Sequence, residues 1–132
     1  MTGQLVAVYG SLKAGFYNHR GLGDDKEFLG KSSVRGVMYS NGSYPKLYHP
    51  QGKSKHPLGY SLARFHELEV YRISDARFNA ITQMEIGAGY RPEFIETPYG
   101  TATIYYMPHE HFYDGDHWVE AYTHDALASK FA

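Results

Sequence analysis

The sequence predicts an α+β fold in which a small mixed β-sheet curls into a barrel with flanking helices. A continuously apolar run at residues 5–9 predicts a buried strand near the N-terminus. Several later segments carry strand signals, whereas residues 76–85 repeat apolar side chains at helical spacing. Strands and helices therefore follow one another in the order strand, loop, strands, helix, strands, helix, which favours this class.

The first half of the chain is expected to contain most of the loops. Residues 5–9 form a strand that we expect to be central, and residues 13–23 contain three glycines and predict a loop. Residues 28–30 and 34–39 predict strands with breaks, and Asn41-Gly42 is a hairpin signal. Three prolines within residues 43–59 predict extended chain and loop.

The second half contains the clearest helix. Residues 60–74 predict one long or two short strands, and residues 92–95 and 101–107 predict two strands around a turn at 98–100. Between them, a helix over residues 76–85 has Ser74 as its N-cap and ends at Gly87 and Gly89. A second helix is expected over residues 118–131, with three side chains facing inward, Trp118, Tyr122 and Leu127.

Composition narrows the classes of function. The 132 residues are 42% hydrophobic and show no repeat, which predicts a single domain over residues 1–132. The chain has 13 basic and 14 acidic residues, so it lacks the excess of positive charge that binding to the phosphate backbone of a nucleic acid requires. No apolar run approaches a membrane span, and the absence of cysteine excludes thiolate chemistry. The N-terminus lacks a basic segment before its short apolar run, so we expect a cytoplasmic protein.

The stretch from Tyr9 to Leu12 is the first candidate for a binding site. Gly10 lets the chain turn after the strand, and successive backbone N–H groups in such a turn attract anions. Ser11 adds a hydroxyl, so the loop could hold a carboxylate or a phosphate, although it matches neither the Walker nor the dinucleotide-binding pattern. The alternative, left open by these residues alone, is an ordinary turn after a strand.

Glu85 is the second candidate. It follows Met84 and precedes Ile86 at the end of the predicted helix. A carboxyl group among apolar neighbours has a raised pKa, as a general acid/base near neutrality requires. The alternative is a solvated glutamate on the polar edge of the helix, and spacing does not decide between the two.

Histidines near the C-terminus offer a third possibility. His109, His111, His117 and His124 lie close to several carboxylates, and the spacing of the first two would place both on one face of a strand, where they could bind a divalent cation. No HExxH pattern is present, so we expect a solvated segment and no metal. His19 could either face the pocket or steady its own loop with a hydrogen bond.

Residues 6–22, VAVYGSLKAGFYNHRGL, resemble the N-terminal signature of the γ-glutamylcyclotransferase-like family, which includes the γ-glutamylamine cyclotransferases and the AIG2-like proteins. In that family a strand ends in YGSL or YGTL and is followed by an Asn-His pair. The likeness continues through segments resembling the family's FLG, YP and GELYRI sequences to its LDxxEG sequence, over roughly residues 5–107. The glutamate of that last sequence corresponds to Glu85, and Tyr90-Arg91 resembles the aromatic and basic pair beyond it.

The resemblance implies a cofactor-independent enzyme on the family's fold, with a small γ-glutamyl molecule as its partner. Such an enzyme cyclises a γ-glutamyl amine or peptide to 5-oxoproline and releases the amine. It implies Glu85 as the catalytic acid/base and a substrate site that includes the loop Tyr9, Gly10, Ser11 and Leu12 together with Tyr90. The amine that leaves and the oligomeric state are not implied.

Two departures from the family pattern lie near Glu85. Ile81-Thr82 stands where the family usually has Leu-Asp, and Ile86 replaces the usual glycine after the glutamate. The second departure motivates an alternative, namely a catalytically inactive module on the same fold that binds a small ligand or a partner.

Overall fold

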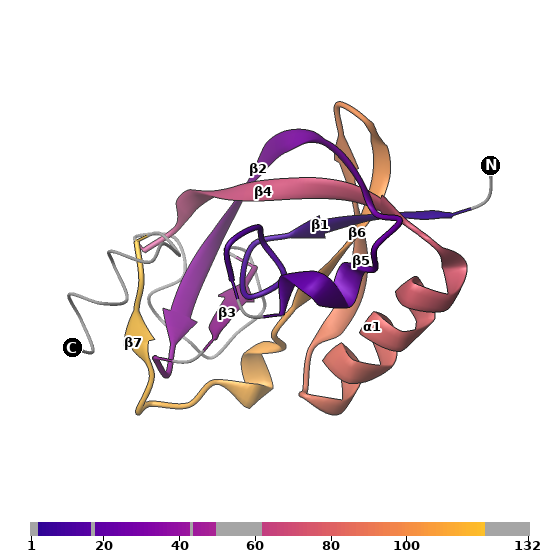
Figure 1. The fold of residues 1–132 in the computed structure, drawn as a ribbon. Coiled ribbons are helices and arrows are strands. Elements are labelled where there is room, and N and C mark those ends of the chain that lie inside the picture. The colour runs from indigo at the N-terminus through magenta and orange to yellow at the C-terminus, as the bar shows by residue number, and fades with distance from the viewer. Residues whose placement is uncertain (1–2, 17, 43, 50–61, 121–132) are drawn as a thin grey trace.

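The computed structural model describes residues 3–16, 18–42, 44–49 and 62–120. Figure 1 shows one α-helix against a strongly curved sheet. The elements in chain order are β1 (Gln4–Val8), the 3-10 turn η1 (His19–Leu22), β2 (Glu27–Ser40), β3 (Pro45–Tyr48), β4 (Arg64–Ile73), α1 (Asp75–Gly87), β5 (Arg91–Thr97), β6 (Gly100–Tyr106), the 3-10 turn η2 (His109–His111) and β7 (His117–Trp118).

The sheet has seven strands and is mixed. Its strand order is β3-β2-β4-β1-β6-β5, with β7 paired to β2, and only the pairing of β1 with β6 is parallel. The sheet curls so that the end of β6 meets β3, where the Met107 N–H donates to the Leu47 carbonyl at 2.8 Å. The predicted α+β class with a curling mixed sheet is confirmed, although the hydrogen-bonded strand order does not close into a barrel.

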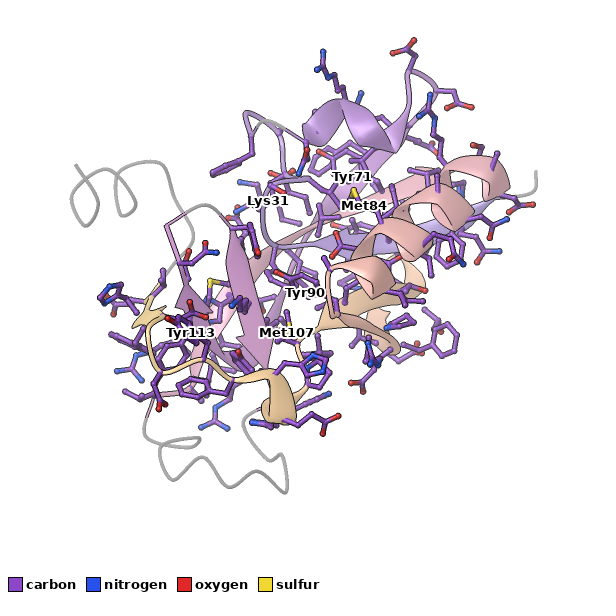
Figure 2. The ribbon with its side chains drawn as sticks, turned by 90° about the horizontal axis from the view of Figure 1, so that it is seen from below. Lys31, Tyr71, Met84, Tyr90, Met107 and Tyr113 are labelled. Carbon is purple, nitrogen blue, oxygen red and sulfur yellow. The ribbon has the colours of Figure 1, made fainter. Side chains whose placement is uncertain are left out.

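Strand β1 is central, as predicted, and both of its faces are covered. Val6 and Val8 pack into one apolar cluster, whereas Ala7 and Tyr9 pack into another on the opposite face. Because side chains alternate along a strand, a strand buried on both faces reads as a continuous apolar run. The first cluster also contains Ile81 of α1 together with Tyr90 and Met107, which Figure 2 labels.

Strand β2 differs from its prediction. Instead of two strands with breaks it is one strand of 14 residues, paired with β4 along most of its length. The expected break at Gly30 is a β-bulge, where φ is +150° and a β-carbon would collide with the Tyr99 side chain. The long partner strand thus overrides the local breaking signal, and glycine accommodates the irregularity.

The predictions for the hairpins and the helix agree with the structure. Antiparallel pairing of β2 with β3 follows the Asn41-Gly42 signal, and β5 pairs with β6 around the predicted turn. Residues 64–73 form one long strand, β4. Helix α1 begins after Ser74, whose hydroxyl accepts the Arg77 N–H at 3.2 Å as an N-cap.

The helix predicted from Trp118 is wrong at its start. Trp118 lies in β7, opposite Tyr39 of β2, and its indole N–H donates to the Leu62 carbonyl at 3.0 Å. At this position the chain pairs with β2 and the indole N–H finds a hydrogen-bond acceptor. These two interactions outweigh the local helix propensity. The remainder of that prediction, residues 121–131, lies outside the described residues.

Candidate active site

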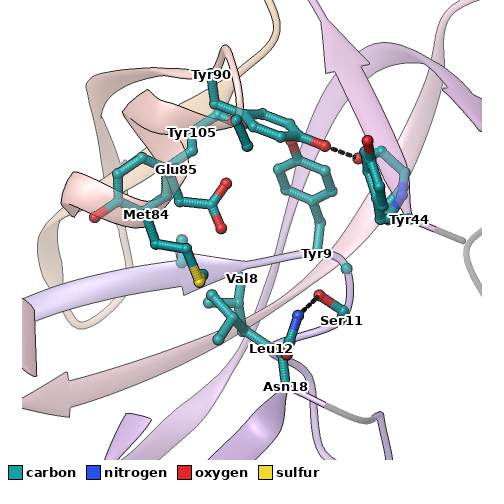
Figure 3. A pocket seen from close by; sticks show the side chains of 14 residues that line it. Val8, Tyr9, Ser11, Leu12, Asn18, Tyr44, Met84, Glu85, Tyr90 and Tyr105 are labelled. Carbon is teal, nitrogen blue, oxygen red and sulfur yellow. Dashed lines mark hydrogen bonds between the residues drawn. The ribbon is translucent and has the colours of Figure 1, made fainter. Parts of the chain in front are cut away.

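A cavity of about 270 Å³ opens beside the end of β1, between the loop that follows this strand and the last turns of α1. Figure 3 shows the carboxyl group of Glu85 directed into it from the helix side. The cavity is lined by every residue predicted for the site, namely Tyr9, Gly10, Ser11, Leu12, Glu85 and Tyr90. The fold therefore places together two segments that are far apart in the sequence.

The loop after β1 is held by hydrogen bonds between its own backbone N–H and carbonyl groups. The carbonyl of Gly10 accepts the Lys13 N–H at 2.9 Å, and that of Ser11 accepts the Asn18 N–H at 3.0 Å. The Asn18 side-chain amide also donates to the Ser11 hydroxyl at 3.0 Å. The N–H groups of Gly10, Ser11 and Leu12 donate to no turn or loop carbonyl of the described residues, and all three residues line the cavity. Backbone N–H groups of such a loop can bind an anion.

His19 steadies this loop and does not line the cavity. Its Nδ1 atom lies 2.7 Å from the Leu12 carbonyl oxygen, and its ring packs edge-on against Tyr71. Of the two interpretations of His19 given above, the structure supports the hydrogen bond that steadies the loop.

Glu69 also supports the loop, and sequence reasoning missed it. This buried carboxylate accepts the Ala14 N–H at 2.8 Å and the Tyr71 hydroxyl at 2.9 Å. A glutamate on the same strand as buried Leu68 and Val70 was the only available signal.

Gly10 is needed for a reason other than the predicted one. It is not among the glycines with positive φ, so the turn itself does not demand a glycine. A β-carbon at this position would instead lie 2.6 Å from Cγ and 2.9 Å from Cδ of Pro45, a residue of β3 that also lines the cavity. Glycine thus permits the close approach of the loop to β3.

The carboxyl group of Glu85 has an unusual environment for a helix end. The side chain is half-buried, and it has no hydrogen-bond partner among the described residues. Burial raises the pKa of Glu85 from its ordinary value of 4.5 to about 7. The alternative of a fully solvated glutamate on the polar edge of the helix is not the one observed.

Tyrosine rings form much of the wall around Glu85. The Tyr9 hydroxyl donates to the Tyr105 carbonyl at 2.5 Å, and the Tyr90 hydroxyl donates to the Pro45 carbonyl at 2.6 Å. Burial, with a smaller contribution from the Glu85 charge, raises the pKa of both hydroxyls, so these rings stay neutral. No cation lines the described cavity, which is why nothing offsets the effect of burial on Glu85.

The two departures near Glu85 have different environments. Ile86 is 42% exposed and does not line the cavity. Thr82, in contrast, is half-buried, and its hydroxyl lies 2.6 Å from the hydroxyl of Tyr105. Tyr105 lines the cavity, and sequence reasoning did not single it out, because its hydroxyl contacts the site's helix only in the folded sheet.

The histidine segment does not form the arrangement considered for a metal. His109 and His111 lie in the 3-10 turn η2. The His109 Nε2 atom is 3.0 Å from the His49 carbonyl oxygen, and the His111 Nδ1 atom is 3.1 Å from the Gly89 carbonyl oxygen. Asp116, expected to be solvated, is buried and pairs with Lys46 at 2.6 Å. Over residues 3–120, apart from the gaps given above, no group of three metal-binding side chains occurs, and His124 lies beyond this range.

In the same part of the chain, no helix has the length and apolar character needed to cross a membrane.

The family model and the curated relatives point to one family. The family model described as gamma-glutamyl cyclotransferase, AIG2-like, matches residues 6–123. A Pyrococcus horikoshii protein provisionally named a gamma-glutamylcyclotransferase is 31% identical over 100 residues, which cover 76% of this chain and 75% of that protein. A Vibrio cholerae protein with the same provisional name is 32% identical over 110 residues, covering 81% and 84%.

Solved structures support the fold. The crystal structure of the Pyrococcus horikoshii protein has a TM-score of 0.61 at 28% identity and covers 79% of this chain and 77% of its own. The crystal structure of a mouse AIG2-like protein has a TM-score of 0.68 at 17% identity and covers 93% and 90%. This chain belongs to the gamma-glutamyl cyclotransferase, AIG2-like family.

Proposed function

We propose that this protein converts a small γ-glutamyl amine or peptide into 5-oxoproline and a free amine, with Glu85 as general acid/base and without a cofactor. One observation supports this proposal above all others. The carboxyl group of Glu85 and the loop residues Gly10, Ser11 and Leu12 border the same cavity of about 270 Å³. Its volume is near the lower end of the range for ligand pockets, which suits an amino-acid-sized substrate.

Substrate binding would use the two sides of this cavity differently. The N–H groups of the loop hold the α-carboxylate of the substrate, since rigid backbone donors bind an anion without losing side-chain entropy. The α-amine is then directed toward Glu85. Tyr90 contributes its ring as a wall, because its hydroxyl proton is committed to the Pro45 carbonyl.

The reaction needs orientation and proton transfer. The α-amino nitrogen attacks the γ-carbonyl carbon, the five-membered ring closes, and the bond between this carbon and the leaving nitrogen breaks. Glu85 takes one proton from the α-ammonium group, which frees the nitrogen lone pair for attack, and takes a second once the new bond has formed. It delivers both in turn to the leaving nitrogen, which departs as an ammonium while the ring nitrogen keeps one N–H. A pKa of about 7 lets one carboxyl group perform both steps near neutral pH.

The test is turnover of a panel of γ-glutamyl amines, γ-glutamyl dipeptides and glutathione, measured as 5-oxoproline. We expect Glu85→Gln to lower kcat by about 100-fold or more while 5-oxoproline still binds, because the amide keeps the shape but cannot carry the proton. The matched control is Glu110→Gln at an exposed position of η2, which should leave kcat unchanged. If the wild-type protein forms no 5-oxoproline from any member of the panel, the proposal is wrong.

The alternative is an inactive module that binds a small ligand, suggested by Ile86. The exposed position of Ile86, outside the cavity lining, gives this departure no direct effect on the site and favours the enzyme. Binding of a γ-glutamyl compound without turnover, observed by calorimetry alongside the product assay, would favour the module instead.

A further inference from the structure

Tyr105 of β6 is attached to both sides of the candidate site. Its backbone carbonyl accepts the Tyr9 hydroxyl at 2.5 Å, at the start of the loop that would hold the substrate carboxylate. Its side-chain hydroxyl lies 2.6 Å from the Thr82 hydroxyl on α1. Tyr105 itself is buried and lines the cavity.

Thr82 occupies the position on α1 that transmits this attachment to Glu85. The two residues are three positions apart, so they lie on the same face of the helix, one turn from each other. A hydrogen bond at Thr82 therefore restrains both the rotation and the sliding of the turn that carries Glu85. Figure 3 shows Tyr105 and Glu85 on the helix side of the cavity, with the Glu85 carboxyl group directed into it.

Apolar packing alone holds α1 weakly against the sheet. Ile81 is the only residue of the helix that is fully buried, and Met84 and Ile86 in the last turns are 48% and 42% exposed. Phe78 packs against the same apolar cluster while partly buried, and apolar contact of this kind is non-directional. A hydrogen bond to the buried Tyr105 side chain adds a directional restraint on where Glu85 sits.

The charge of Glu85 affects the pKa of the Tyr105 hydroxyl. Burial raises the pKa of the Tyr105 hydroxyl, the hydrogen bond with Thr82 offsets part of this rise, and the charge of the Glu85 carboxylate adds to it. The other titratable groups coupled to Glu85 are Tyr9, at the end of β1, and Tyr90, before β5, both neutral near pH 7. Burial is the cause of the raised pKa of Glu85, and no charged group of the described residues lines its cavity besides Glu85 itself.

We infer that Tyr105, held to α1 through Thr82 and to the start of the loop after β1 through Tyr9, is a positioning residue that sets the separation between the Tyr9–Leu12 loop and the Glu85 carboxyl group. This inference rests on the proposed function for its catalytic meaning. The threonine that replaces the family's usual aspartate provides the helix side of the connection.

Variants that remove only the hydroxyl–hydroxyl bond test the inference. Thr82→Val and Tyr105→Phe keep the size of the side chains, and Tyr105→Phe keeps the carbonyl that Tyr9 uses. We expect each to lower kcat on a γ-glutamyl substrate by about tenfold, with a smaller change in KM, because small misplacement of a catalytic group is costly. The double variant should lose no more than the larger single effect, since both changes remove one bond.

Two controls separate positioning from a general loss of stability. Thr82→Ser retains the hydroxyl group and should therefore keep the wild-type kcat. Tyr113→Phe removes a hydroxyl from a tyrosine that is 64% exposed and should change nothing. Independent losses that multiply in the double variant, or wild-type kcat in both single variants, would overturn the inference.

A second measurement does not depend on turnover. Titration of the Glu85 carboxyl carbon by NMR, in protein labelled at glutamate, should give a pKa near 7 in the wild type and a lower pKa in Thr82→Val and Tyr105→Phe, because a shifted helix admits water to the carboxyl group. Thr82→Ser and Tyr113→Phe should titrate like the wild type. An inactive wild-type protein would end the proposed function alone, whereas unchanged Glu85 titration in both hydroxyl-deleted variants would end this inference.

Discussion

The carboxyl group of Glu85 couples the stability of the protein to pH. Its pKa is about 7 in the folded chain against an ordinary value of 4.5, so between these values the folded state binds more protons than the unfolded state. Stability contributed by this group is fully present below about pH 4.5 and is lost as pH rises through about 7. The physical cause is burial of a carboxylate without a compensating partner.

We therefore expect Glu85→Gln to stabilise the protein in a pH-dependent way. The gain in free energy of unfolding over the wild type should be small at about pH 5 and reach on the order of 2 kcal/mol at about pH 8. Urea unfolding at the two pH values measures it, with Glu110→Gln as a control that shows no such trend. A gain that is the same at both values would contradict the raised pKa.

Gly10 and Gly87 can be compared directly, because a β-carbon would have close neighbours at Gly10 and none at Gly87. A methyl group on Gly10 would meet the Pro45 ring at 2.6 Å, whereas nothing lies within 4 Å of a β-carbon at Gly87 in the last turn of α1. Gly10→Ala should lower the free energy of unfolding by about 1–3 kcal/mol through overpacking. Gly87→Ala should leave it unchanged or raise it by up to about 1 kcal/mol.

Chemical denaturation of both glycine variants checks this pair. Equal effects of the two substitutions would show that the close approach of Pro45 is not what requires glycine after β1.

At the scale of elements, α1 depends on its first turn as well as on its packing. Ser74 caps the helix by accepting the Arg77 N–H at 3.2 Å, and Asp75 follows in the first turn. The Asp75 carboxylate interacts favourably with the helix dipole. Ile81 is the only buried residue of the helix and Phe78 packs beside it while partly buried, so the cap adds to a modest apolar contact.

Ser74→Ala should accordingly lower the free energy of unfolding by about 1 kcal/mol, measured by urea denaturation. Ser74→Asp supplies another good N-cap and should retain most of the stability. If both variants were equally destabilised, the cap hydrogen bond would not be the contribution that Ser74 makes.

At the scale of the whole molecule, one buried ion pair connects β3 to the segment before β7. Lys46 and Asp116 are 70 positions apart in the sequence, and the Lys46 Nζ atom lies 2.6 Å from the Asp116 Oδ2 atom. Their side chains are 13% and 1% exposed. β3 carries Pro45 into the cavity wall, so this pair joins the site to the C-terminal part of the described chain. Removing one partner would leave a buried charge unpaired.

Lys46→Met should cost about 3 kcal/mol of unfolding free energy because Asp116 then stays buried and unpaired. The control is Lys31→Met, since Lys31 pairs with Glu67 at 3.4 Å with side chains 62% and 49% exposed. That surface pair should contribute less than about 1 kcal/mol. The double variant Lys46→Met with Asp116→Leu should recover part of the loss, and a larger loss in the double variant would contradict this account.

Most of the secondary structure follows from short-range patterns. The apolar run before Tyr9 predicts a strand covered on both faces, and Ser74 with Ile81 predicts a capped helix packed on one side. These patterns can be recognised because each depends on residues only a few positions apart. Gly30 and Trp118 are exceptions for the opposite reason, since the strand pairing around each is set by a distant segment.

By itself, the sequence determined the family pattern, the mixed sheet with its capped helix, and the candidates Glu85 and the Tyr9–Leu12 loop. Only the tertiary structure decided that these candidates border one cavity, that Pro45 is what requires Gly10, and that Tyr105, 96 positions from Tyr9 in the sequence, contacts both Tyr9 and α1. The physical reason is that backbone preference and periodicity act over a few residues. Desolvation, close approach and hydrogen bonding between hydroxyl groups depend on atoms that only the folded sheet brings together.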